Sequence, residues 1–75
     1  MNKVDVAHIL VFGYPHGLYE GFRRDKLDDM FAWCLENVAS TGWEYIYPES
    51  NSSPRGHYFY FEDDATATMF ALKFA

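Results

Sequence analysis

The chain has 75 residues, of which 49% are hydrophobic and 20% aromatic, and its formal net charge is -5 at pH 7. A chain of this length forms a single domain, residues 1–75, around one core, and so many aromatic residues exclude an intrinsically disordered protein. The acidic balance argues against bulk electrostatic attraction to nucleic acid or to an anionic membrane. It suits a basic protein partner, and it equally suits a charge that only keeps the protein soluble.

The first apolar segment, residues 4–14, is rich in β-branched and aromatic residues and predicts a strand. Both alternating sets of its side chains are apolar, which is typical of a central strand covered on both faces. The segment is too short to span a membrane. Because the single cysteine, Cys34, has no partner for an internal disulfide, we expect a cytoplasmic protein. A glycine-punctuated loop is expected over residues 13–21.

The clearest helical pattern covers residues 23–40. Its apolar positions recur at helical spacing and predict one buried stripe. The stripe consists of Leu27, Met30, Phe31, Cys34, Leu35 and Val38. Within the stripe, Cys34 is expected to be a buried structural thiol and not a nucleophile. Gly42 ends the helix.

Two aromatic strands and a second helix are predicted in the remaining sequence. Residues 43–47 and residues 56–62 are the strands, separated by a polar loop over residues 49–54. Asp63 or Asp64 then caps the second helix by accepting backbone N–H bonds. The residues expected to face inward from it are Ala65, Met69, Phe70 and Leu72. Residues 73–75 either continue this helix or begin a short fourth strand.

The order β-α-β-β-α predicts an α+β fold of the ferredoxin-like, split β-α-β type. A right-handed crossover followed by a hairpin places the third strand beside the first in an antiparallel-type sheet. Both helices then cover the same face of that sheet, and the other face has no covering element.

Strand alternation predicts which side chains occupy the helix-free face. We expect Ile46, Phe59 and Phe61 to point into the core. The remaining aromatic side chains of the two strands then form the predicted binding surface: Trp43, Tyr45, Tyr47, Tyr58 and Tyr60. Tyrosine and tryptophan are enriched at binding hot spots, so this face is predicted to bind a partner protein or a second copy of the chain. The alternative is that cross-strand aromatic pairs only stabilise a small sheet.

The ionisable side chains do not predict catalysis. His8 and His57 are expected on neighbouring strands, but no third ligand lies at a spacing that would complete a zinc site. Arg23, Arg24 and Lys26, at the predicted start of the first helix, are a candidate contact for a phosphate or carboxylate group, with a solvated loop as the alternative. No nucleotide-binding fingerprint is present. We therefore expect a non-enzymatic protein without a cofactor or a metal ion.

One segment resembles the RNA-recognition motif family. Residues 55–61 read RGHYFYF and are followed by EDDA, which is similar to the third strand, acidic loop and helix start of that family. The resemblance implies binding of single-stranded RNA or DNA on exposed aromatic rings. In the family's register His57 and Phe59 would be exposed, whereas the strand alternation above exposes Tyr58 and Tyr60.

The C-terminal third resembles another group of proteins. Residues 58–74, YFYFEDDATATMFALKF, are similar to the ending of many small tailed-phage proteins. That resemblance implies a host-modulating or regulatory factor that acts in the host cytoplasm by stoichiometric binding to a host protein. A further alternative is an inhibitor whose acidic residues, at 28–29 and 62–64, mimic the phosphates of a nucleic acid.

Overall fold

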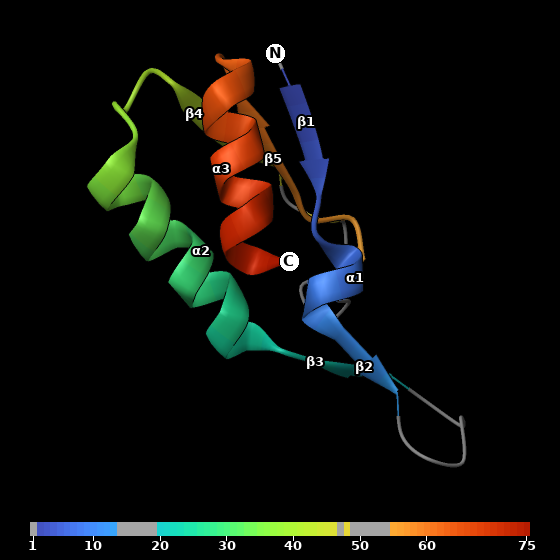
Figure 1. Cartoon of the computed structure of the whole chain (residues 1–75). Coiled ribbons are helices and arrows are strands. Elements are labelled where there is room, and N and C mark those ends of the chain that lie inside the picture. The colour runs from blue at the N-terminus through green and yellow to red at the C-terminus, as the bar shows by residue number, and fades with distance from the viewer. Residues whose placement is uncertain (1, 14–19, 47, 49–54) are drawn as a thin grey trace.

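The computed structural model describes residues 2–13, 20–46, 48 and 55–75, and within them the chain has an α+β fold. In chain order the elements are β1 (Asn2–Asp5), α1 (Ala7–Leu10), β2 (Val11–Gly13), β3 (Glu20–Phe22), α2 (Arg24–Asn37), β4 (Trp43–Ile46), β5 (Tyr58–Phe61) and α3 (Asp64–Phe74). The two long helices, α2 and α3, lie on the same side of β1, β5 and β4 (Figure 1). Within the described ranges, no helix has the length and apolar character needed to cross a membrane.

The main sheet has the strand order β1-β5-β4, and both neighbouring pairs are antiparallel. The third predicted strand, β5, therefore lies beside the first, as the sequence indicates. Because β1 and β4 are both antiparallel to β5, they run in the same direction. In the middle of the sheet Phe59 is paired with Val4 on one side and with Tyr45 on the other.

The prediction of one long strand over residues 4–14 is wrong. β1 ends at Asp5, whose Oδ1 accepts a hydrogen bond of 2.9 Å from the backbone N–H of Ala7. The single turn α1 follows, in which the N–H of Leu10 donates to the carbonyl oxygen of Val6. Val6 and Leu10 lie four residues apart and are both fully buried. A short apolar run carries no period that separates a buried strand from a buried helical turn.

The chain after α1 forms a second, two-stranded sheet that was not predicted: β2 falls within the predicted strand over residues 4–14, and β3 begins within the predicted loop over residues 13–21. β2 pairs with β3 in antiparallel register, with Val11 opposite Phe22. Residues 14–19, which link the two strands, lie outside the described residues. The backbone N–H of Arg23 donates to the carbonyl oxygen of Leu10 at 2.7 Å, which ties the start of α2 to the end of α1.

The predicted helix over residues 23–40 is confirmed as α2, but it ends at Asn37, and the extended residue Val38 is its C-cap, so the prediction that Gly42 ends the helix is wrong. One residue of the predicted stripe is also misplaced. Leu27, Met30 and Cys34 are buried, and Phe31 packs against the core from the flank of the helix. Leu35, in contrast, is 75% exposed. α2 covers only a three-stranded sheet, so its buried stripe is narrower than the apolar stripe of its sequence.

The second predicted helix is confirmed as α3, and Asp63 is its N-cap. Its carboxylate accepts hydrogen bonds from the N–H of Ala65 (3.3 Å) and from the hydroxyl of Thr66 (2.6 Å). The helix continues to Phe74, so residues 73–75 do not begin a fourth strand.

The inward face of α3 is confirmed only for Phe70, which is fully buried. Ala65, Met69 and Leu72 are exposed, so their predicted inward positions are wrong. The helix is rotated so that Ala67 and Phe74 accompany Phe70 against the core. These positions follow the spacing i, i+3 and i+7, which is one face of a helix.

Candidate functional site

The predicted aromatic surface is divided between the two faces of the sheet. On β4, Glu44 and Ile46 are exposed, while Trp43 and Tyr45 point toward the helices and pack against the core. The outward positions predicted for Trp43 and Tyr45 are therefore wrong, as is the inward position of Ile46. Tyr47 lies outside the described residues.

The register of β4 against β5 explains this orientation. Trp43 is opposite Phe61 and Tyr45 is opposite Phe59, and directly opposed residues share a face of the sheet. Because Phe59 and Phe61 are fully buried, their partners on β4 point to the same side. Burying two large rings removes more apolar surface from water than burying one isoleucine would.

The helix-free face is correctly predicted for Tyr58 and Tyr60, which are half-buried and alternate with the two buried phenylalanines of β5. Their neighbours on this face are charged or aliphatic. They are Lys3 and Asp5 on β1, and Glu44 and Ile46 on β4. The Nζ atom of Lys3 lies 4.2 Å from the ring centroid of Tyr58, a cation–π contact. The face is thus a mixed, charged surface and not a five-ring platform.

The register of the RNA-recognition motif is not met by this strand. That register exposes His57 and Phe59, but His57 is only 3% exposed and Phe59 is fully buried. Neither ring is available to stack on a base.

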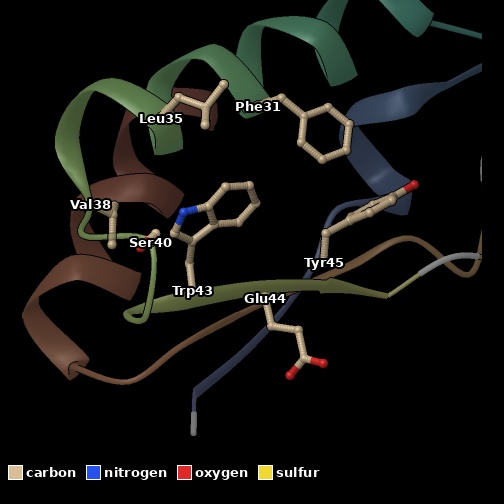
Figure 2. A pocket seen from close by; sticks show the side chains of 7 residues that line it. All are labelled: Phe31, Leu35, Val38, Ser40, Trp43, Glu44 and Tyr45. Atoms are coloured by element: carbon tan, nitrogen blue, oxygen red, sulfur yellow. The ribbon is translucent and has the colours of Figure 1, made fainter.

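An open, mainly apolar groove lies between α2 and β4, and we call it the α2–β4 groove (Figure 2). It has a volume of about 420 Å³ and is lined by Phe31, Leu35, Val38, Ser40, Trp43, Glu44 and Tyr45. In Figure 2 the side chains of Trp43 and Tyr45 rise from β4 toward Phe31 and Leu35 of α2, whereas Glu44 points to the opposite side of the strand. The ring centroids of Phe31 and Tyr45 are 4.7 Å apart in an edge-on arrangement, so the two sides of the groove are in contact at this point.

The groove opens beside the outer edge of the main sheet. β4 is the terminal strand in the order β1-β5-β4, and within the described ranges no strand pairs with its outer side. The N–H of Glu62 donates to the carbonyl oxygen of Gly42 at 3.0 Å, so this pair is hydrogen-bonded across β4 and β5. Hydrogen-bonded and non-hydrogen-bonded pairs alternate along an antiparallel ladder. The backbone N–H and C=O of Trp43 therefore point outward, away from β5.

A second pocket, which we call the polar pocket, continues from the groove along α2. Its volume is about 390 Å³, and it shares Phe31 and Tyr45 with the groove. The hydroxyl of Tyr45 and the Nδ1 atom of His57 are hydrogen-bonded at 2.5 Å. Arg24 and Asp28 line the same pocket, which gives this end of the surface polar and charged character.

The predicted anion contacts do not converge on one site. Arg24 belongs to the polar pocket, where its guanidinium carbon lies 5.1 Å from the ring centroid of Phe22. Arg23 and Lys26 instead line a separate pocket of about 290 Å³, together with Lys73 of α3. The sequence did not predict the part of Lys73, because nothing in a linear pattern brings the end of α3 to the start of α2.

The end of α3 accounts for this basic pocket without a ligand. Phe74 and Ala75, at the C-terminal end of the helix, also line the pocket. The carbonyl groups at a helix C-terminus carry partial negative charge and attract cations. His8 also lines this pocket; it lies in α1 and is exposed, whereas His57 is buried, so the expectation that His8 lies on a strand next to His57 is wrong.

The remaining reactive side chains serve the fold. Burial raises the pKa of the Cys34 thiol to about 12, so the thiol is protonated at neutral pH. The hydroxyl of Thr66 and the N–H of Ala65 lower the pKa of Asp63, whose carboxylate is engaged as a helix cap. Among the side chains that the structure describes, no three histidine, cysteine, aspartate or glutamate residues are grouped to hold a metal ion.

Comparisons with known proteins yield no relative: no protein-family model matches the chain, and no curated protein or solved structure is significantly similar to it.

Proposed function

We propose that this chain is a small, non-enzymatic protein-binding module that takes an extended segment of a partner protein beside β4. The backbone of that segment extends the main sheet, and alternate side chains enter the α2–β4 groove. One observation carries the proposal: Trp43 supplies both an outward-facing backbone and a ring that lines the groove. Addition of a strand to an exposed sheet edge, with side-chain pockets next to it, is a recurrent mode of peptide recognition.

The dimensions of the groove suit such a segment. Trp43 and Tyr45 are two residues apart along β4, which is about 7 Å in an extended strand. Alternate side chains of an added strand recur at the same interval. Leu35 is 75% exposed at the rim of the groove and offers apolar surface that a partner would remove from water. Aromatic rings around such a centre are typical of binding hot spots.

The fold and the biological setting are part of the same proposal. The order β1-β5-β4, with α2 between β1 and β4 in the chain, supports a ferredoxin-like, split β-α-β unit. The likeness of residues 58–74 to small tailed-phage proteins supports a host-modulating factor in the host cytoplasm, with a host protein as the partner. The binding site proposed here is the groove and the β4 edge, in place of the five-ring sheet face.

A matched pair of helix-surface substitutions tests the proposal. Leu35 and Leu72 are 75% and 73% exposed, but only Leu35 lines the groove. Peptides selected from a random displayed library on the wild-type protein should bind Leu72→Lys with unchanged affinity. They should bind Leu35→Lys at least tenfold more weakly, because a desolvated lysine in the groove costs at least about 1.4 kcal/mol. Thermal unfolding of both variants checks that each remains folded.

Two outcomes of that experiment would contradict the proposal. One is a library that yields no binder to the wild-type protein. The other is a set of binders that do not distinguish Leu35→Lys from Leu72→Lys, which would place their contact outside the groove.

A further inference from the structure

We infer that the segment bound beside β4 alternates apolar and basic residues, with a lysine or arginine directly opposite Glu44. This inference rests on the proposed strand addition and specifies its partner. The apolar residues face the α2–β4 groove, and the basic residue lies on the helix-free face of the extended sheet.

The alternation of β4 dictates the alternation of its partner. Trp43 and Tyr45 point to the helix side of the sheet, while Glu44 points to the helix-free side. Residues opposite one another on neighbouring strands share a face. A segment that places apolar side chains next to Trp43 and Tyr45 must therefore place the residue between them next to Glu44.

Glu44 has an open position for a cation on its outer side. On the side toward β5, Glu44 is paired with Tyr60. Tyr60 is in turn paired with Lys3 of β1. The ammonium group of Lys3 lies over the ring of Tyr58, which is two residues from Tyr60 along β5. Within the described part of the chain Glu44 makes no ion pair, and it is exposed.

The charge of the whole chain favours the same partner. A net charge of -5 attracts a basic segment and accelerates its association. The same charge repels a second copy of the chain. An antiparallel pairing of two β4 strands centred on Glu44 would also set the two Glu44 carboxylates opposite one another, which is unfavourable.

Short peptides of opposite charge test this inference. One acetylated and amidated peptide alternates valine with lysine, and the other alternates valine with glutamate. Each is titrated into the ¹⁵N-labelled protein while the backbone amides of β4 and the indole N–H of Trp43 are followed by NMR. We expect the lysine peptide to bind at least about threefold more tightly, since opposite charges facing one another across strands are stabilising and like charges are destabilising. The difference should shrink as salt is added.

Charge reversal provides the specific readout. Glu44→Lys should bind the glutamate peptide more tightly than the lysine peptide, an exchange of preference that loss of structure would not produce. Glu36→Lys makes the same change of charge on an exposed residue of α2 outside the groove. It should keep the preference of the wild-type protein for lysine.

Each contrary outcome overturns a defined part of the account. If both peptides shift the β4 amides with equal affinity, the inference of a basic partner is wrong, whereas the proposal that a partner strand adds to β4 is supported. If neither peptide perturbs β4 or Trp43, both the partner and the strand addition fail. If the same amides shift with protein concentration alone, the occupant of the edge is a second copy and the inferred partner is wrong.

Discussion

Both faces of the main sheet carry aromatic side chains, but these side chains have different surroundings on the two faces. On the helix side, Phe59 and Phe61 are fully buried and the rings of Trp43 and Tyr45 form one wall of an open groove. On the helix-free side, Tyr58 and Tyr60 lie among charged neighbours. The comparison shows that aromatic content alone does not identify a binding surface. What distinguishes the groove is that its rings lie next to an edge strand.

The largest expected difference between the two faces concerns stability. Phe59 contacts the rings of Phe31, Tyr45 and Phe70. Phe59→Ala should lower the free energy of unfolding by about 3–5 kcal/mol, because it leaves a cavity at the centre of the core. Tyr58→Ala should cost well under half as much. Urea unfolding followed by tryptophan fluorescence measures both, and equal losses would show that the two faces are buried to a similar extent.

The second prediction compares adjacent residues on α2. Cys34 is fully buried with a raised pKa, whereas Leu35 is 75% exposed. In the variant Leu35→Cys, one thiol should react with an aromatic disulfide reagent at pH 8 at least about a hundredfold faster than the other, because thiolate and access are both needed for reaction. The wild-type protein should show only the slow reaction. A fast reaction in the wild-type protein would contradict the burial of Cys34.

The third prediction separates two tyrosine hydroxyl groups. Tyr45→Phe removes the hydroxyl that is bonded to the buried His57 and should cost about 1–2 kcal/mol of stability. Tyr60→Phe, on the helix-free face, should cost less than about 0.5 kcal/mol. Thermal unfolding of the two variants under identical conditions provides the comparison. Equal effects would mean that the bond between Tyr45 and His57 adds no stability.

The smallest expected effect concerns the cap of α3 and its dependence on pH. Because the folded protein lowers the pKa of Asp63, the ionised carboxylate stabilises the fold above the unfolded pKa of about 3.9. That contribution is lost as the pH falls through the lower, folded pKa. Asp63→Ala should therefore have a lower melting temperature than the wild-type protein at pH 6. On acidification, the melting temperature of the variant should fall less than that of the wild-type protein. Equal losses of melting temperature on acidification in the wild-type protein and in Asp63→Ala would contradict this role of the cap.

The sequence predicts α2 because its apolar residues recur with a helical period, whereas α3 has no such clear period and its inward face was mostly misassigned. It predicts the capping role of Asp63 because the acidic residue directly precedes the helical segment. The strand alternation of β4 is misassigned because Trp43, Tyr45 and Ile46 are all apolar. With apolar residues on both parities, the pairing register decides which ones are buried, and register is not encoded locally.

The groove is beyond sequence reasoning for a similar reason. It forms where residues of α2 lie over β4, and the side chain of Leu35 belongs to the same apolar stripe as the buried Leu27 and Met30. Its exposure follows from the narrowness of the sheet beneath the helix. The division of Arg23 and Arg24 between two pockets likewise depends on the position of α3.

Solvent exchange of the backbone amide of Trp43 tests the central claim most directly. This amide points outward from β4, so a segment that adds to the sheet must accept a hydrogen bond from it. In the presence of a saturating valine–lysine peptide, its hydrogen exchange should slow at least about tenfold, since each tenfold of protection corresponds to about 1.4 kcal/mol. Unchanged exchange at Trp43 with a bound peptide, accompanied by protection or shifts confined to Tyr58 and Tyr60, would contradict strand addition and return the binding site to the helix-free face.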